Sequence, residues 1–596
     1  MMSRTLFPLC CAITLLCLTG RIAEALEVNL QLVSSPALKV GNAIVWTAEA
    51  NDTPIDYQFS IAPVGQGFTV VHDFSNSNNR FEWTPMNEGS YIARLVARRS
   101  GKGALASAEA GFHVESRIGA DGNAVVSASA HPLVFLYSAP PCDVRAMTAE
   151  FVKLNSFDDP TITDAKICDR ATSMNFWIAG LEENRDYTIR YRLWNDQGES
   201  VFESQPATFR TGDVTASFPA VQVLKQDPLY MDLRRGLMLQ SLNRTAGPGG
   251  VRDPTPVARK LDGTLVWYYD SMAHGAVNNL LRPLGQGLMM VIPGENNPHG
   301  LRAIDLAGNT IWETNADAVS IRLAAMGLPP IQNFHHDALV LPDGMILALA
   351  NSQRQIEGAT QDDPPRQVIG DVLVLLNRDF NVRWVWDAFE KLDRNKKAVL
   401  GEMQGAAEDW THGNALQYLP DGNILYSIRH WDWVIKIDFQ DGMGSGDIIW
   451  RMGQGGDFAI RCDDPWPWFS HQHDAHFDGF RLWVFDNGNT RSAVPGQLDN
   501  SRGQVYQIDL DTHIATLELN ADLGGFSPAL GSAQRLGNGN YQFLSGDLFD
   551  PNTGTYSSQS AEVSLEDGNS NIRYIFRTAS AAYRTFRIIS LYSSGE

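Results

Sequence analysis

Two short phrases recur along the second half of the chain, and this repetition limits the fold more than any other feature. A turn followed by tryptophan occurs at residues 262–267, 307–312, 381–384 and 446–450. A Pro-Asp-Gly phrase occurs at 341–347 and 419–425, with a weaker copy at 536–541. Each phrase predicts a turn followed by a strand. Strand-turn units that return at intervals of tens of residues are typical of a β-propeller.

The repeating region sets the size of the predicted propeller. It begins near residue 214, which leaves about 380 residues, enough for six to eight blades of roughly 45–60 residues each. We predict an all-β chain with a six-bladed β-propeller over residues 214–596.

The region before the repeats predicts two smaller β-sandwiches. Short strands that alternate apolar and polar residues fill residues 26–118 and indicate an immunoglobulin-like sandwich. A Gly-Asn linker at 119–123 follows, and a second set of strands at 124–213 resembles a fibronectin type III module. One strand of this second set, at 186–193, alternates over eight residues as a half-buried strand does.

Length and charge agree with several domains and argue against one class of partner. A chain of 596 residues is too long for one hydrophobic core. The formal net charge of −21 repels phosphate backbones, so we expect no nucleic acid partner. The sequence leaves the oligomeric state open, with a homodimer as one alternative.

The first residues predict export. Arg4, an apolar stretch at 6–18 and the small-x-small sequence Ala23-Glu24-Ala25 form the pattern of a signal peptide over residues 1–25. The alternative is an uncleaved membrane anchor. No later apolar run is long enough to span a bilayer, so we expect a secreted or periplasmic protein.

Three cysteines remain after the predicted signal peptide. Cys142 and Cys168 fall in the same predicted sandwich, and an exported protein meets an oxidising environment, so we expect them to form a disulfide. Cys462 is left over.

Histidines concentrate where the chemistry is expected. Seven of the thirteen lie between residues 335 and 476, and several of these precede a repeated turn. The seven are His335, His336, His412, His430, His471, His473 and His476. Strands that open a blade line the central channel of a propeller, so these residues can converge from different blades. Neighbours on a strand face opposite ways, so we expect only one of His335 and His336 to face the channel.

Each histidine also has a structural interpretation, because a single histidine in a strand is usually packed or solvated. His471 and His473 would face one side of a regular strand and could bind a metal. No carboxylate in the sequence offers a clear third ligand, so we predict no metal and no cofactor. Arg429 alone could serve in a structural ion pair.

Taken together, four motifs resemble the PAPS-independent arylsulfate sulfotransferases, a family of secreted bacterial propeller enzymes. They are His-His-Asp at 335–337, Trp-x-His-x-Asn at 410–414, Ser-x-Arg-His at 427–430 and Gln-His-Asp at 472–474. The family's disulfide near the catalytic loop has no counterpart here, since Cys462 stands alone in that region, and the family's usual single sandwich is two here.

The resemblance implies the reaction and the roles. A histidine takes a sulfuryl group from an aryl sulfate and passes it to a phenol, and His473 maps to this nucleophile. His336, His412 and Arg429 map to its catalytic partners, and His335, Asn414 and Ser532 to substrate binding.

Elementary chemistry agrees with these roles, because a sulfuryl group in transfer needs a positioned nucleophile and cations around its oxygens. A sulfate or phosphate ester hydrolase and a non-catalytic binding propeller stay as alternatives.

Overall fold

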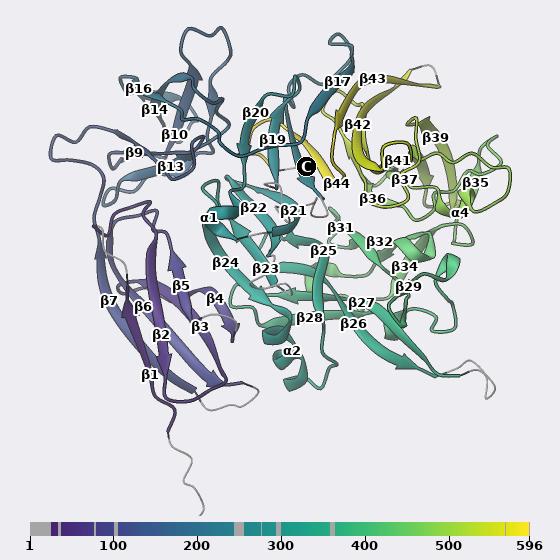
Figure 1. Cartoon of the computed structure of the whole chain (residues 1–596), viewed down its shortest axis with the longest axis horizontal. Coiled ribbons are helices and arrows are strands. Elements are labelled where there is room, and N and C mark those ends of the chain that lie inside the picture. The colour runs from purple at the N-terminus through teal and green to yellow at the C-terminus, as the bar shows by residue number, and fades with distance from the viewer. Residues whose placement is uncertain are drawn as a thin grey trace, which may run out of the picture.

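The structure is a computed structural model that describes residues 25–33, 37–76, 79–100, 105–243, 255–275, 277–293, 300–357, 364–566 and 568–594 (Figure 1). The predicted all-β class is confirmed, with 52% of residues in strands and 6% in helices. The predicted signal peptide lies outside the described residues except for Ala25. Within the described ranges, no helix has the length and apolar character that a membrane crossing requires.

The first strands form two sheets around an aromatic core. One sheet contains β1 (Val28–Leu32), β2 (Ile44–Ala50) and β5 (Arg80–Trp83). The other contains β4 (Thr69–Ser75), β3 (Ile55–Pro63), β6 (Gly89–Arg99) and β7 (Leu105–Val114). Trp46, Phe59 and Phe81 pack between them, with the two phenylalanine rings stacked at 5.2 Å.

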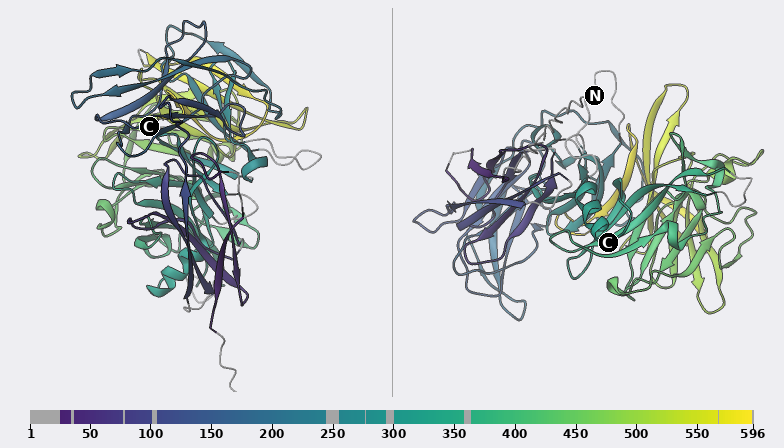
Figure 2. Two further views of the ribbon diagram at one scale, coloured as in Figure 1. Left: turned by 90° about the vertical axis from the view of Figure 1, so that its left-hand side faces the viewer. Right: turned by 90° about the horizontal axis from the view of Figure 1, so that it is seen from below.

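A second group of strands follows. One sheet is built on β10 (Ala146–Lys153) and β14 (Asp186–Trp194), with β11 (Thr161–Ile162), β12 (Lys166–Ile167), β15 (Ser200–Glu203) and β16 (Ala207–Arg210) beside them. The other sheet contains β13 (Met174–Ile178), β9 (Phe135–Ala139) and β8 (Val125–Ala128). Cys142 and Cys168 form a disulfide, and Cys462 is a free, exposed thiol. Figure 2 shows both groups of strands beside the later sheets.

The described residues after 213 form six groups of antiparallel strands, one of which is joined to the sheet of β4 by a parallel pairing of Glu313 with His72. The first three in chain order are β18 (Leu237–Leu242), β19 (Val257–Lys260) and β20 (Leu265–Tyr268); β21 (Val277–Gly285), β22 (Leu288–Pro293), β23 (Gly300–Ile304) and β24 (Thr310–Asn315); and β25 (Asn333–Val340), β26 (Ile346–Ile356), β27 (Arg366–Leu376) and β28 (Val382–Asp387). The next two are β31 (Gly413–Tyr418), β32 (Ile424–Ile428), β33 (Trp433–Ile437) and β34 (Ile448–Gly453); and β36 (His473–Phe477), β37 (Arg481–Asp486), β38 (Arg502–Asp509) and β39 (Ile514–Asp522). The last is β40 (Ser532–Arg535), β41 (Tyr541–Asp550), β42 (Thr555–Glu566) and β43 (Asn569–Thr578).

Short elements extend these sheets. Strands β29 (Met403–Gln404) and β30 (Ala407–Asp409) join the sheet of β27, and β35 (Ala459–Arg461) joins β39. The α-helices are α1 (Ser271–His274), α2 (Ala316–Ala325), α3 (Ala388–Lys391) and α4 (Asn489–Ser492). Three 3₁₀ turns are η1 (Val399–Gly401), η2 (Arg429–Trp431) and η3 (Gln440–Gly442).

Strands from the two ends of this region share sheets. β17 (Val221–Gln226) pairs with β43, and β44 (Ala582–Ile588) pairs with β18. One edge strand of each sheet contacts its counterpart in the next, in the order β21, β25, β31, β36, β40, β44 and back to β21. These edge strands carry the residues described below.

The repeated phrases occupy equivalent places in these sheets. The Pro-Asp-Gly phrases form the turns after β25 and β31, and the weaker copy forms the turn after β40. Gly344, Gly422 and Gly539 have φ values of 82°, 78° and 90° there, a region that glycine adopts without strain. The repeated tryptophans lie on β20, β24, β28 and β34, each at the far side of its sheet from the edge strand that opens it.

Candidate functional site

Four of the residues singled out in the sequence lie together, although they come from three successive sheets. His336 lies on β25, His412 precedes β31, Arg429 follows β32, and His473 begins β36. The rings of His336 and His412 are 4.8 Å apart between centroids. His473 lies close enough to Arg429 and His412 for both to lower its pKa, although burial lowers it more.

Left-handed backbone positions aim these side chains. His336 has a φ of 56°, His412 of 49° and Asp474 of 55°, and the pairing register shifts beside each of them. Non-glycine residues with such angles cost about 1–3 kcal/mol each and are concentrated at functional sites. The edge strands are therefore bulged where the histidines occur.

The bulge overturns one expectation about His335 and His336. Strict alternation would send their rings to opposite faces, but their Nδ1 atoms are 2.7 Å apart and their rings meet edge to face. The left-handed turn at His336 breaks the alternation that the prediction assumed. His335 also lies with Nε2 3.1 Å from Oδ1 of the buried Asp371. The three residues thus form a chain from Asp371 through His335 to His336.

His473 is held in one tautomer by a residue that the sequence analysis did not single out. Its Nδ1 lies 2.7 Å from Oδ1 of Asn487. The Asn487 amide nitrogen donates to the carbonyl oxygens of Ser527 (2.7 Å) and Leu530 (3.0 Å), which turns Oδ1 toward the histidine. Nδ1 of His473 must therefore carry the proton, and the lone pair is on Nε2.

Electrostatics keep His473 neutral. Burial lowers its pKa well below the ordinary value, and the positive charge of Arg429 lowers it further. The pKa of His336 is also well below its ordinary value, first because of burial and then because His412 lies beside it. At neutral pH both imidazoles are uncharged and have a lone pair available.

Arg429 and His412 supply the polar hydrogens of the cluster. Arg429 is buried on η2 and donates from Nη2 to the carbonyl oxygen of Pro528 (3.0 Å) and from Nη1 to Nε2 of His430 (2.5 Å). His412 places Nδ1 2.6 Å from Oδ2 of Asp409 and keeps a partly exposed ring. An aspartate in this position fixes the ring and directs Nε2 of His412 away from itself.

The two remaining candidates have other contacts. Asn414 is buried, donates from Nδ2 to the carbonyl oxygen of Gln472 (2.7 Å), and leaves Oδ1 without a hydrogen bond among the described residues. Ser532 donates to the carbonyl oxygen of Thr585 (3.1 Å) and accepts from its amide (3.2 Å). The hydroxyl of Ser532 thus links β40 to β44, two strands of different sheets.

Comparison with known proteins identifies the region that contains this cluster. The family model for Arylsulfotransferase (ASST) matches residues 241–587, more than half of the chain. The chain belongs to the arylsulfotransferase (ASST) family. This confirms the family that the motifs predict, a family of sulfotransferase enzymes.

Other comparisons add little to the arylsulfotransferase assignment. No curated protein matches the chain. Among solved structures, the FN1-FN3 domains of chicken CNTN1 match over 30% of this chain and 62% of that chain, with 12% identity and a TM-score of 0.14. The chain thus covers less than two thirds of that structure, and the score is too low to carry a conclusion about the fold.

Next to the histidines, the arylsulfotransferase region contains a buried network of ion pairs that the sequence did not indicate. Arg584 on β44 lies 3.2 Å from Asp337 and 3.5 Å from Asp474, and Arg282 makes a two-pronged contact with Asp337 at 3.0 and 2.9 Å. These are the aspartates that follow His336 and His473, and their ion pairs are with these arginines. Asp474 also contacts His476, at 3.3 Å.

His471 and His473 do not lie on one face of a regular strand. His471 has a φ of 50° and precedes β36, so the two rings do not share a regular strand face. His471 instead approaches Glu402 and Asp432. Among the described residues, two clusters of possible metal ligands result, Glu402–His430–His471 and Asp409–His412–His430. The sequence indicated neither, because Glu402 comes from a separate loop and Asp409 from the end of β30.

Proposed function

We propose that this arylsulfotransferase moves a sulfuryl group from an aryl sulfate to a phenol through a sulfohistidine at His473, by a ping-pong mechanism and without PAPS. The observation that carries the proposal is the hydrogen bond from Nδ1 of His473 to Asn487. It leaves an uncharged Nε2 lone pair beside an arginine. That arrangement suits attack on a sulfur atom whose oxygens bear negative charge.

The proposed architecture is the six-bladed propeller over residues 214–596. The six antiparallel sheets are its blades, and their edge strands surround the centre, which is supported by the order in which those strands contact one another. The sandwiches at 26–118 and 124–213 precede it. A signal peptide at 1–25 directs the chain to the periplasm or out of the cell, in agreement with the disulfide.

In the first half-reaction, Nε2 of His473 attacks the sulfur atom. The N–S bond forms as the bond between sulfur and the aryl oxygen breaks, and that oxygen leaves with the electron pair. A proton on Nε2 of His412 neutralises the phenolate, since Asp409 can stabilise the charged ring while it holds that proton. The guanidinium of Arg429 balances the charge on the sulfuryl oxygens, as in phosphoryl transfer.

In the second half-reaction, an acceptor phenol replaces the first product. Its oxygen attacks sulfur, the N–S bond breaks, and the electron pair returns to Nε2 of His473. His336 has its Nδ1 engaged by His335, and the uncharged His336 ring can take the phenol proton on Nε2. The Asp371–His335 pair stabilises the charge that appears on His336 until this proton passes to the neighbouring His412, which restores both residues for the next cycle.

Labelling of the intermediate tests this proposal. Incubation with an aryl sulfate alone, followed by quenching and peptide mass spectrometry, is expected to find the added sulfuryl mass on the His473 peptide. His473→Asn should abolish both label and transfer, with unfolding unchanged within about 1 kcal/mol because no apolar core is lost.

The alternatives give different results in the same experiment. Release of phenol at a rate that added acceptor does not change would indicate a hydrolase, with water in place of the phenol. No turnover at all would indicate a binding protein. Normal transfer by the His473→Asn variant would refute the nucleophile and require a single displacement.

A further inference from the structure

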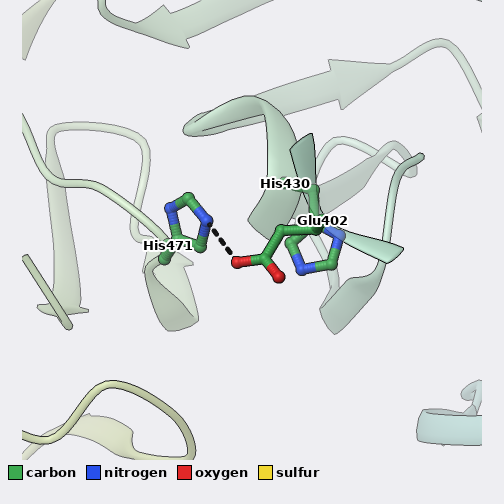
Figure 3. Close-up of side chains that lie close together, drawn as sticks. All are labelled: Glu402, His430 and His471. Atoms are coloured by element: carbon green, nitrogen blue, oxygen red, sulfur yellow. Dashed lines mark ion pairs between the residues drawn. The ribbon is translucent and has the colours of Figure 1, made fainter. Parts of the chain in front are cut away.

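Glu402, His430 and His471 come together beside the proposed catalytic cluster but have no part in the reaction just described. Their ligand atoms lie within 4.8 Å of one another. Figure 3 shows the carboxylate of Glu402 between the two imidazole rings, with one oxygen directed at His471. The three residues come from different elements: Glu402 follows η1, His430 lies on η2, and His471 precedes β36.

Nε2 of His471 faces the carboxylate, Nε2 of His430 accepts from Nη1 of Arg429, and both rings use Nδ1 elsewhere. Nδ1 of His471 lies 3.0 Å from Oδ1 of Asp432, and Nδ1 of His430 lies 2.5 Å from the carbonyl oxygen of Asp409. A proton on Nδ1 satisfies each oxygen, so each Nε2 carries a lone pair. Metal-binding histidines are oriented in this way, with the second nitrogen bonded to a carboxylate or a backbone carbonyl.

The contact between His471 and Glu402 does not have the geometry of a hydrogen bond. Nε2 of His471 lies 3.3 Å from Oε1 of Glu402, yet this fully buried nitrogen makes no hydrogen bond among the described residues. A cation placed between the two atoms would join them. A buried, unsatisfied acceptor is costly, and a metal ion removes the cost.

The surroundings favour a divalent cation. Glu402, Asp409 and Asp432 all lie near enough to Arg429 to raise its pKa against the lowering effect of burial. Lys396 is a second cation, close to Asp432, and Arg451 lies near Lys396. Three carboxylates thus gather around Arg429. Glu402 is about one third exposed, which gives an ion a route in from solvent.

We propose that Glu402, His430 and His471 bind a divalent transition metal of the zinc class. Two imidazoles and one carboxylate are a common zinc ligand set with a fourth position left open. Zinc bonds of about 2.0–2.2 Å require the ligand atoms to draw closer than they are now, and the partly exposed Glu402 is the one free to move. The Asp409–His412–His430 cluster is a weaker choice, because His412 already occupies the Asp409 carboxylate.

Metal binding at this position competes with Arg429. Nη1 of Arg429 donates to Nε2 of His430, the atom that the metal would take. An ion there breaks this hydrogen bond and repels the guanidinium that the proposed reaction needs. In this proposal the metal therefore inhibits the reaction. The inhibition rests on the proposed function, whereas the binding of the metal does not.

Zinc binding can be measured without any assay of turnover. Tag-free protein competes with a chromophoric chelator for Zn²⁺, and we expect one ion per chain, with no competition from Mg²⁺ or Ca²⁺, which prefer oxygen ligands. Glu402→Gln should weaken binding more than about 10-fold, and Asp432→Asn, which loosens His471, by about 10–100-fold. His513→Gln removes an exposed histidine and should bind zinc as the unaltered chain does.

The substitution at Glu402 decides the outcome, because this partly exposed side chain can be replaced without disturbing the core. Equal zinc affinity in Glu402→Gln and the unaltered chain, or no binding by the latter, would overturn the site. Saturating zinc should lower turnover several-fold in the unaltered chain and leave Glu402→Gln unaffected. Full turnover with zinc bound would refute the competition with Arg429. Absence of a labelled His473 would refute the proposed function and leave zinc binding unchanged.

Discussion

Asn487 accepts the Nδ1 hydrogen of His473 at 2.7 Å, and two backbone carbonyls hold its amide in the orientation that makes this possible. The amide thus decides which nitrogen of the histidine is free to react. Asn487 touches no reacting atom in the proposed mechanism, so it acts as a positioning residue.

Replacing Asn487 by alanine should therefore reduce turnover and leave donor binding nearly intact. Without the acceptor, His473 populates both tautomers and rotates, and loss of such a supporting partner costs about 10–100-fold. Steady-state kinetics should show the change in kcat, with KM for the aryl sulfate within about twofold. Asn571→Ala, on β43, is the matched control. An equal loss in both variants, or an unchanged kcat, would contradict the positioning role.

Arg429→Lys should cost most of the activity although the charge is kept. The planar guanidinium reaches Pro528 and His430 at the same time, which a single ammonium group does not reproduce. Loss of one preorganised donor to a developing anion typically lowers turnover by about 10²–10³-fold. Comparison of kcat/KM for the two proteins measures it, and full activity in the lysine variant would remove Arg429 from the reaction.

Stability should fall as the pH is lowered, partly because of His131. This buried ring lies with Nε2 2.9 Å from the carbonyl oxygen of Tyr268 and accepts at Nδ1 from the amide of Leu133 (3.0 Å). Burial lowers the pKa of His131 to about 4. Between pH ~6.5 and about 4 the unfolded chain binds a proton that the folded chain excludes, which costs up to about 3 kcal/mol.

Urea unfolding at pH 7 and pH 4.5 tests this sign. The His131→Gln variant should be less stable at pH 7 but lose less stability on acidification than the unaltered chain. His513→Gln, at an exposed position, should keep the full loss. A variant at His131 with an unchanged pH dependence would show that this residue does not contribute.

Removal of the disulfide should affect stability and not turnover. Cys142 and Cys168 are 26 residues apart and lie in the strand group before the arylsulfotransferase region. The double substitution to serine is expected to cost about 2–4 kcal/mol, because the unfolded chain gains freedom. Thermal unfolding should shift downward while kcat of the folded protein stays within about twofold. A large fall in kcat would link these strands to the reaction.

The sequence predicted the sheets better than the side-chain geometry within them. The alternation at 186–193 corresponds to β14, and the Pro-Asp-Gly phrases correspond to turns, because these patterns depend on neighbours in the chain. The conformation of His336 depends on a bulge that no local pattern marks. Arg584 is an ordinary polar residue in the sequence, and only contacts between distant strands bring it to the histidines. Asn487 meets His473 across the hairpin of β36 and β37, and the polar run 487–489 directly after β37 is the one local signal that could have indicated it.

The pairing of β17 with β43 and of β18 with β44 has a consequence for how the molecule is made. The strands at 221–226 and 237–242 leave the ribosome more than 300 residues before their partners do. The strands at 125–210 have partners close in sequence and can fold early, whereas the sheets around Arg584 wait for the last strands. Contacts so far apart in the chain form slowly. The arylsulfotransferase region thus stays incomplete until synthesis is nearly finished, and the chain emerges with its last-closing sheets at the site that holds Arg584.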